Sequence, residues 1–293
     1  MSAVPGTSRQ KKKDLIIEYP GGVFDFNQKT YIMGILNVTP DSFSDGGRYY
    51  TLKDAVEHAL KMADDGADLI DVGGESTRPG SLPISAEEEM RRVIPVIEEL
   101  SGEIAIPISI DTYKSSVAKK AIEAGARMIN DISALRFDQG MKMVAAHHKV
   151  PVVLMHMRGR PATMQEDVVY HSLIPEITQF LKERIKEAER SGIAPNRIII
   201  DPGIGFGKPV IEGNLKIIKH LSFFKTLNKP ILIGPSRKAF IAEITGEEGE
   251  GRDEGTAALG AIAINSGANM IRVHDVKRMK RVAQMVDALK RVN

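Results

Sequence analysis

The chain has no cysteine and no tryptophan among its 293 residues. Without cysteine it can form no disulfide, no thiolate nucleophile and no cysteine-ligated metal site, and it tolerates a reducing cytosol. It also has no apolar run long enough to span a bilayer. We therefore expect a cytoplasmic protein with no membrane partner.

Neither sign of charge dominates, because 40 Lys and Arg residues stand against 38 Asp and Glu residues. The formal net charge of +2 gives no general attraction to nucleic acid or to membranes. Lys11, Lys12 and Lys13 precede a very short apolar run flanked by charges, which does not fit a signal peptide. We expect residues 1–13 to form a disordered basic arm and residues 14–293 to form one large α/β domain.

Eight short apolar runs recur along the chain, each followed by a polar loop and a segment with helical spacing. This pattern is typical of βα units around a parallel sheet. The hydrophobicity of the runs is continuous, which suits strands covered on both faces. The runs are Tyr31–Leu36, Leu69–Val72, Ile106–Ile110, Met128–Asn130, Val150–Met155, Ile198–Ile200, Ile231–Ile233 and Met270–Val273.

Eight such units predict a single (β/α)8 TIM barrel of the α/β class, and a doubly wound open sheet is the structural alternative. The stretch "LIIEYPGGVFDF" before the first run predicts a β-hairpin, which we place at the lower end of the barrel. The stretch "EGTAALGAIAINSGA" predicts an extra helix of small residues before the eighth strand.

Polar side chains stand at the end of each predicted strand. Because parallel strands end on one face, these groups would gather at the mouth of a barrel, where active sites are built. A simpler interpretation exists for Asp111, Asp131 and Asp275, since such residues often cap the following helix. It does not fit Asp201, which a Pro-Gly pair follows. The set is Asn37, Glu75, Asp111, Asn130, Asp131, His156, Asp201, Ser236 to Lys238, Arg272 and His274.

The chemistry of this set predicts a small-molecule site with two sides. Asp111, Asn130 and Asp201 offer acceptors and a carboxamide to a flat heterocycle that carries amino and ring N–H donors. Cations on the opposite arc suit a phosphate or pyrophosphate. These cations are Arg237, Lys238, Arg272 and His274.

Metal binding is constrained by the seven histidines, which show no zinc-ligand spacing. Mg²⁺ is compatible with the sequence, because it needs few protein ligands and binds largely through substrate phosphate and water. We expect Asn37 to contribute to it. The stretch "DPGIGFGKP" lacks the spacing of a P-loop, so we interpret it as a strand-end loop whose glycines let the backbone approach a ligand.

Seven motifs, in order from Tyr31 to near the C terminus, together resemble those of dihydropteroate synthases. They are "MGILNVTPDSFSDGG", "DVGGESTRPG", "ISIDTYK", "INDI", "DPGIGFGK", "GPSRKAF" and "RVHDV". The resemblance implies a pterin-binding TIM barrel that joins 7,8-dihydropterin-6-ylmethyl pyrophosphate to p-aminobenzoate in folate biosynthesis. It also implies competition by sulfonamides and a homodimer, and it does not cover the first thirty residues.

The resemblance assigns roles to individual residues. Two mobile loops, Val38–Tyr50 and Gly74–Ser85, would close over the second substrate. The catalytic residues would be Asp45, Arg78 and Lys238, and Asn37 would hold Mg²⁺. The residues that bind pterin and pyrophosphate would be Thr77, Asp111, Asn130, Asp201, Phe206, Lys238, Arg272 and His274. Those around the aminobenzoate and in loop closure would be Phe43, Thr77, Arg78, Pro79 and Ala239.

The implied chemistry is C–O cleavage to a stabilised pterin cation, followed by attack of the amine. Positioning and electrostatics suffice for it, without a protein nucleophile. One residue departs from the family pattern, because many members carry a hydroxyl or a larger side chain at the position of Ala239. The side-chain hydrogen bond to the aminobenzoate carboxylate is then missing, whereas backbone N–H groups of the following helix remain.

Two other interpretations stay open. A corrinoid-linked methyltransferase has a related pterin-binding barrel, but the "ESTRPG" and "SRK" segments favour the synthase, and we expect no appended cobalamin module in 293 residues. A non-catalytic pterin-binding protein would keep the barrel without turnover. The intact set of cations argues against it, and an assay decides.

Overall fold

The structure, a computed structural model, describes residues 15–39 and 51–292. The predicted basic arm, residues 1–13, lies outside the described residues, as do Phe43 and Asp45. The loop predicted over Val38–Tyr50 is described only at Val38 and Thr39.

The described residues form an eight-stranded, all-parallel sheet, in the order β8-β7-β6-β5-β4-β3-β10-β9. A parallel bridge between Ile200 and Ile231 joins the two ends of this order, so the sheet closes into a barrel. The open doubly wound alternative is therefore wrong. The strands are β3 (Tyr31–Asn37), β4 (Leu69–Gly73), β5 (Ile108–Asp111), β6 (Met128–Asp131), β7 (Val152–Met155), β8 (Ile198–Asp201), β9 (Leu232–Ile233) and β10 (Met270–Val273).

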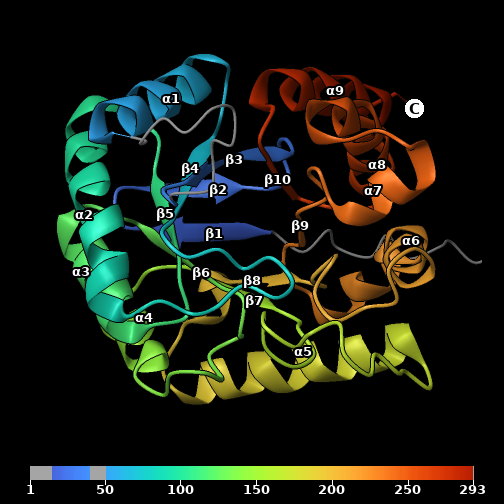
Figure 1. Cartoon of the computed structure of the whole chain (residues 1–293), viewed down its shortest axis with the longest axis horizontal. Coiled ribbons are helices and arrows are strands. Elements are labelled where there is room, and N and C mark those ends of the chain that lie inside the picture. The colour runs from blue at the N-terminus through green and yellow to red at the C-terminus, as the bar shows by residue number, and fades with distance from the viewer. Residues whose placement is uncertain (1–14, 40–50, 293) are drawn as a thin grey trace, which may run out of the picture.

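Helices surround the barrel, and neighbouring helices pack against one another around the ring (Figure 1). The extra helix predicted before the last strand is α8. No helix within residues 15–39 and 51–292 is both long and apolar enough to cross a membrane. The helices are α1 (Leu52–Asp64), α2 (Ala86–Glu103), α3 (Ser115–Ala124), α4 (Met141–His148), α5 (Leu173–Arg190), α6 (Glu212–Lys219), α7 (Ala239–Thr245), α8 (Asp253–Ser266) and α9 (Val276–Leu289), with 3₁₀ turns at Pro195–Arg197, Leu221–Leu227 and Gly249–Arg252.

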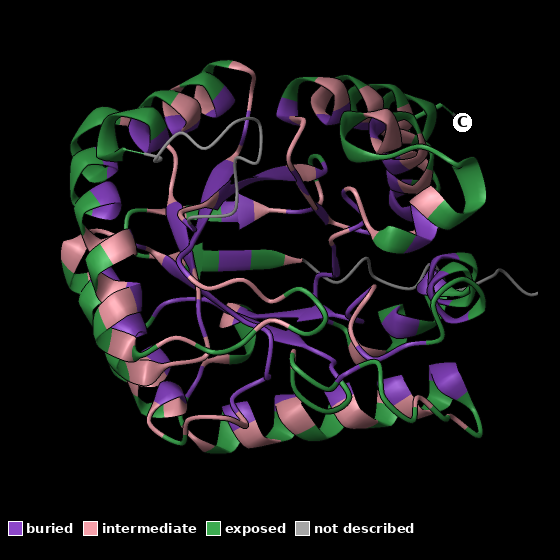
Figure 2. Ribbon diagram, in the orientation of Figure 1, coloured by how far each residue is buried: buried purple, intermediate pink, exposed green. Residues whose placement is uncertain are grey.

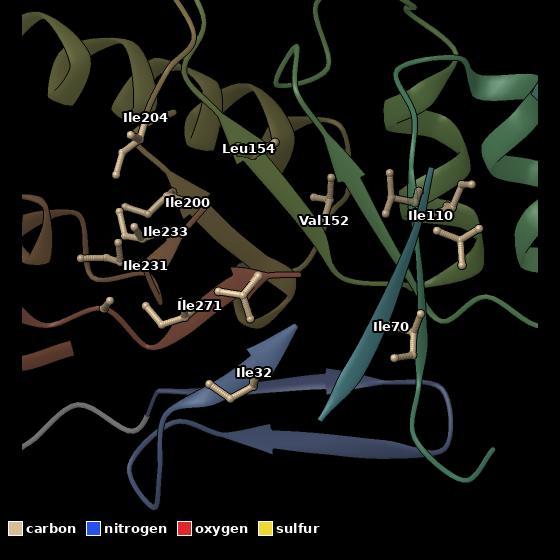
Figure 3. Close-up of a cluster of buried hydrophobic side chains, with 14 of the residues drawn as sticks. Ile32, Ile70, Ile110, Val152, Leu154, Ile200, Ile204, Ile231, Ile233 and Ile271 are labelled. Carbon is tan, nitrogen blue, oxygen red and sulfur yellow. The ribbon is translucent and has the colours of Figure 1, made fainter. Parts of the chain in front are cut away.

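The main core lies between the strands and the helices. Ile32, Ile70 and Ile110 belong to it, together with branched side chains from the other strands (Figure 3). Each helix buries one face against this layer and exposes the other, as the colours of Figure 2 show. Continuous hydrophobicity in the strands therefore reflects burial on both faces, as the sequence predicted.

A second core fills the lower end of the barrel. The hairpin of β1 (Ile16–Tyr19) and β2 (Gly22–Asp25) is antiparallel and places Ile17 and Phe24 in this core. Phe26 joins them from the following turn. Seven strands contribute one side chain each to the same cluster: Met33, Leu69, Met128, Val153, Ile199, Leu232 and Met270. The predicted plug is confirmed.

Side chains cap the starts of helices α1 and α9. The Thr51 and Asp54 side chains form a reciprocal capping box at the start of α1. Asp275 caps α9, since its Oδ1 accepts a hydrogen bond of 2.9 Å from the N–H of Arg278.

Replacing Phe24 by Ala tests the plug. Its side chain is 2% exposed, and its ring centroid lies 4.7 Å from that of Tyr19 and 5.2 Å from that of Tyr31. We expect the free energy of unfolding, measured by urea denaturation, to fall by about 3–5 kcal/mol because a large cavity replaces the ring. The control is Val23→Ala in the same strand, where the side chain is 55% exposed and the expected change is within about 0.5 kcal/mol. Equal changes in the two variants would contradict a plugged barrel.

Candidate active site

Inside the barrel, a layer of polar side chains lies directly above the apolar second core. Side chains alternate between the two faces of a strand, so a residue two positions after a member of that core also points into the barrel. Asp71 follows Leu69 in this way, and Asp201 follows Ile199. Both carboxylates are buried, as is Asn130 on β6. Some predicted residues thus lie within the strands and others in the loops after them. Those within strands are Asn37, Asp111, Asn130, Asp131, Asp201 and Arg272, and those after them are Glu75, His156, Ser236, Arg237, Lys238 and His274.

Arg272 on β10 is the centre of this layer. Its Nε donates to Asp71 Oδ2 at 2.6 Å, and its Nη2 donates to Asp111 Oδ2 at 2.7 Å. The Nδ2 of Asn130 donates to the same oxygen of Asp71 at 2.9 Å. Side chains from β4, β5, β6 and β10 thus meet in one hydrogen-bonded network inside the barrel.

The predicted separation of carboxylates and cations into two arcs is wrong at two positions. Arg272 reaches across the barrel to the carboxylates, because a buried carboxylate needs a counter-charge. Arg237 pairs outside this network, where its Nε and Nη2 donate to Asp253 at 2.9 and 2.8 Å. Arg237 therefore anchors the start of α8.

The acidic groups have unusual proton affinities. Burial raises the pKa of Asp111 to about 7, against the opposing charge of Arg272. Burial also raises the pKa of Asp201 to about 6, against the hydrogen bond of 2.7 Å that its Oδ1 accepts from the N–H of Gly203. Neither residue caps a helix. Burial deprives both carboxylates of water, and N–H donors of a ligand can take the place of that water. The site therefore favours a ring with several such donors.

Asp131, for which capping was the alternative, faces away from this network. Its two carboxylate oxygens accept hydrogen bonds of 2.8 Å each from the N–H groups of Ser133 and Leu135. It holds the loop after β6 and caps no regular helix.

The Lys238 side chain packs against the glycine-rich loop that carries Gly205 and Phe206. Its Nζ is 4.3 Å from the centroid of the Phe206 ring, and a Cβ atom at Gly205 would stand 3.0 Å from its Cδ. Gly205, with φ of 82°, therefore gives the lysine stem the room that a side chain would take. Burial, reinforced by Arg272, lowers the pKa of Lys238 to about 8. Ala239 is the first residue of α7 and is exposed.

His274, two residues after Arg272, is held by Ser236. Its Nδ1 lies 2.9 Å from the Ser236 hydroxyl, which also accepts a hydrogen bond of 3.2 Å from the His274 N–H. Burial lowers the pKa of His274 to about 3, and the nearby cations Arg237 and Arg272 add to this effect. The sequence predicted a cation here, whereas the neutral imidazole can only exchange hydrogen bonds.

The predicted loop Gly74–Ser85 is joined at its two ends by Glu75. The Oε2 of Glu75 accepts hydrogen bonds from Ile84 N at 2.9 Å and from Lys114 Nζ at 2.6 Å. Its Oε1 accepts one of 2.6 Å from the Tyr113 hydroxyl. The base of the loop is therefore fixed to the segment after β5.

The tip of this loop carries Thr77, Arg78 and Pro79. Arg78 and Pro79 are exposed, and Thr77 is half-buried. The charge of Arg78 contributes to the lowered pKa of His274, so the guanidinium lies within electrostatic range of that side chain. None of the three takes part in the buried network around Arg272.

Asn37, the last residue of β3, is half-buried and makes no hydrogen bond through its side chain to any other described residue. Its Oδ1 lies 3.8 Å from the point where a Cβ atom would stand if Gly73 carried a side chain. The described residues contain no group of three His, Asp or Glu side chains that could hold a metal. One free carboxamide oxygen fits Mg²⁺ held mainly by phosphate and water.

Two buried charges close to this site were missed from the sequence. Asp71 stands inside an apolar run, and a charge within a strand covered on both faces was a usable signal. Lys208 is fully buried, its Nζ donates to the backbone oxygen of His156 at 2.7 Å, and burial lowers its pKa well below the usual value. Nothing in the local pattern around Lys208 indicated burial.

Comparisons with known proteins agree with this geometry. Residues 33–274 match the family described as pterin binding enzyme. The dihydropteroate synthase of Synechocystis sp. is 47% identical over 268 residues, which are 91% of this chain and 92% of that protein. The structure of Xanthomonas albilineans dihydropteroate synthase with 4-aminobenzoic acid matches with a TM-score of 0.89 and 44% identity, over 96% of this chain and all (100%) of that one. A Yersinia pestis dihydropteroate synthase in a sulfonamide drug complex matches with a TM-score of 0.89 and 41% identity, over 94% and 98% of the two chains. The chain therefore belongs to the dihydropteroate synthase family.

Proposed function

We propose that this chain joins 7,8-dihydropterin-6-ylmethyl pyrophosphate to p-aminobenzoate, giving 7,8-dihydropteroate and pyrophosphate. The observation that carries the proposal is the set of buried Asn130 and Asp201 and half-buried Asp111 around Arg272. It offers acceptors to the amino and N–H groups of a pterin ring. The Xanthomonas albilineans relative, whose structure contains 4-aminobenzoic acid, supports the second substrate.

The reaction needs positioning and charge more than a nucleophile from the protein. The C–O bond between the pterin methylene and pyrophosphate breaks, the amine nitrogen of the aminobenzoate forms the new C–N bond, and the amine releases a proton. Asp111 and Asp201 stabilise the positive charge that develops on the pterin. Lys238, which stays mostly protonated at neutral pH, contacts the pterin next to Phe206.

The leaving pyrophosphate belongs on the side of Asn37 and His274. Mg²⁺ bound at the Asn37 oxygen would neutralise charge on the leaving group. Neutral His274 donates or accepts a hydrogen bond there, and the part of the Arg272 guanidinium that the carboxylates leave free adds positive charge.

The loop residues act on the second substrate. Thr77, Arg78 and Pro79 cover the aminobenzoate and exclude water from the pterin cation. Phe43 and Asp45, outside the described residues, keep the roles that the family resemblance implies. Sulfonamides compete at this site, as the Yersinia pestis drug complex suggests. Since Ala239 offers no side-chain hydrogen bond, its backbone must contact the aminobenzoate carboxylate.

The rival activities have less support. Dihydropteroate synthases match more than nine-tenths of this chain, which argues against a corrinoid-linked methyltransferase. A non-catalytic pterin-binding protein would share the ring site, and turnover alone separates it from the synthase.

Turnover is tested by mixing the purified protein with the pterin pyrophosphate, p-aminobenzoate and Mg²⁺. We expect pyrophosphate and dihydropteroate to appear in equal amounts. Removing Mg²⁺ with EDTA should lower the rate and restoring Mg²⁺ should recover it, because the leaving group loses its counter-charge. Binding of the pterin without any product would show a binding protein instead.

Asp111→Asn and Arg78→Ala separate the two proposed parts of the site. Asp111→Asn should weaken pterin binding by about 10- to 100-fold, because a charged acceptor is lost. Arg78→Ala should leave pterin binding within about threefold and lower kcat by about tenfold or more, since it acts on closure. Calorimetry and steady-state kinetics measure these effects. Equal loss of pterin binding in both variants would contradict the division.

We also propose a homodimer formed through the outer side of α8 and α9. Met285 and Leu289, one turn apart on α9, are 72% and 66% exposed, and Ile262 on α8 is 50% exposed. Exposed apolar side chains of this size on packed neighbouring helices suit a contact between copies. Sedimentation of the wild type should give twice the chain mass of 32.1 kDa, and the double variant Met285→Glu with Leu289→Glu should sediment as a monomer. A wild-type protein at the single mass would refute the dimer.

The cellular location that we propose is the cytoplasm. The support is the cysteine-free composition, which suits a reducing compartment. Cell fractionation tests this location, and finding the protein outside the soluble cytosolic fraction would refute it.

A further inference from the structure

Asp71 is a buried charge that the proposed reaction does not use. It lies in the middle of β4, its exposure is 0%, and its neighbours Ile70 and Val72 belong to the apolar layer under the helices. A carboxylate without solvent is costly unless partners compensate for its charge. Its contacts therefore show what it does.

Both partners of Asp71 use one of its two oxygens. Oδ2 accepts from Arg272 Nε at 2.6 Å and from Asn130 Nδ2 at 2.9 Å. Oδ1 is buried and has no hydrogen-bond partner among the described residues. A single carboxylate oxygen thus connects β6 with β10, which lie on different parts of the barrel wall.

This contact fixes which way the Asn130 amide points. The oxygen of Asp71 that accepts from the Arg272 guanidinium acts only as an acceptor, so the NH₂ group of Asn130 must face it. The carbonyl oxygen of Asn130 then faces the opposite direction and receives no hydrogen bond from the described residues. Asn130 therefore offers the site an acceptor.

The same contact also limits Arg272. Its Nε is used by Asp71 and its Nη2 by Asp111, so the plane of the guanidinium is fixed and Nη1 is left for a ligand. Removing Asp71 would free the guanidinium and the amide together.

We propose that Asp71 is a positioning residue that sets the hydrogen-bond polarity of the ring-binding site. By holding the Asn130 amide in one orientation, it makes the site accept a ring edge that carries an amino or N–H donor and reject an edge that carries a carbonyl. The inference rests on the proposed function, because the ring is taken to be a dihydropterin.

Removing the shared acceptor tests the proposal. Asp71→Leu has a similar size and offers no oxygen, so the Asn130 amide can turn and present its NH₂ group to the ligand. Asp71→Asn is the conservative variant, because its amide oxygen can take the place of Oδ2 and accept from both Arg272 and Asn130. Asn130→Ala removes the group that Asp71 orients, and the double variant, Asp71→Leu with Asn130→Ala, shows whether Asp71 acts through Asn130.

Binding of hydroxymethyl dihydropterin, which carries the ring without pyrophosphate, is measured by calorimetry on each variant. We expect Asp71→Leu and Asn130→Ala each to weaken binding by about 10- to 100-fold, and Asp71→Asn to stay within about threefold of the wild type because it keeps the acceptor. The double variant should lose no more than Asn130→Ala alone. Ser109→Ala is the matched control, because Ser109 pairs with Asp71 in the β4–β5 register and its buried hydroxyl has no partner among the described residues. It should bind the ring as the wild type does.

Three results would overturn the proposal: wild-type affinity in a folded Asp71→Leu protein, losses of Asp71→Leu and Asn130→Ala that add in the double variant, or a loss of about tenfold or more in Asp71→Asn. The last comparison decides even if Asp71→Leu does not fold. A wild-type protein that fails to bind the ring refutes the proposed function. Normal wild-type binding with any of the three results refutes only the role of Asp71.

Discussion

Two carboxylates enclosed in a barrel need a positive charge between them, and Arg272 supplies it. Asp71 and Asp111 come from neighbouring strands, and the guanidinium reaches both from β10. Without it, two enclosed carboxylates would face each other unpaired, which is costly. The carboxylate acceptors inside the barrel therefore depend on this cation. The same arrangement explains why Arg272 is not simply a phosphate-binding residue.

The remainder of the site follows from the two-residue period of the strands. The side chains that fill the barrel at one level are apolar, and those at the next level are polar, as with Leu69 and Asp71. The hairpin plug supports the lower level from beneath. Chemistry at the mouth and stability at the base thus depend on the same strands, and a change in strand register would move every polar side chain to the helix side.

Sequence patterns predicted the barrel, the hairpin and the strand-end residues because each leaves a local trace. An apolar run predicts a buried strand, and a polar residue at its end predicts a mouth residue. The pairing of Arg272 with Asp71 and Asp111 could not be predicted, because Arg272 follows Asp71 by 201 residues and Asp111 by 161 residues in the sequence. The neutral state of His274 and the burial of Lys208 depend on the same three-dimensional surroundings. Arg237 looked like its neighbour Lys238 in sequence, and only its contact with Asp253 separates their roles.

Because the hairpin closes the base of the barrel, ligands can reach its interior only through the mouth. If the ring occupies the polar layer and the aminobenzoate lies above it under the Gly74–Ser85 loop, the second molecule blocks the path of the first. The pterin must then enter before the aminobenzoate, and an early aminobenzoate delays the cycle until it leaves. The plug, far from any reacting atom, thereby imposes a sequence in time on the two substrates.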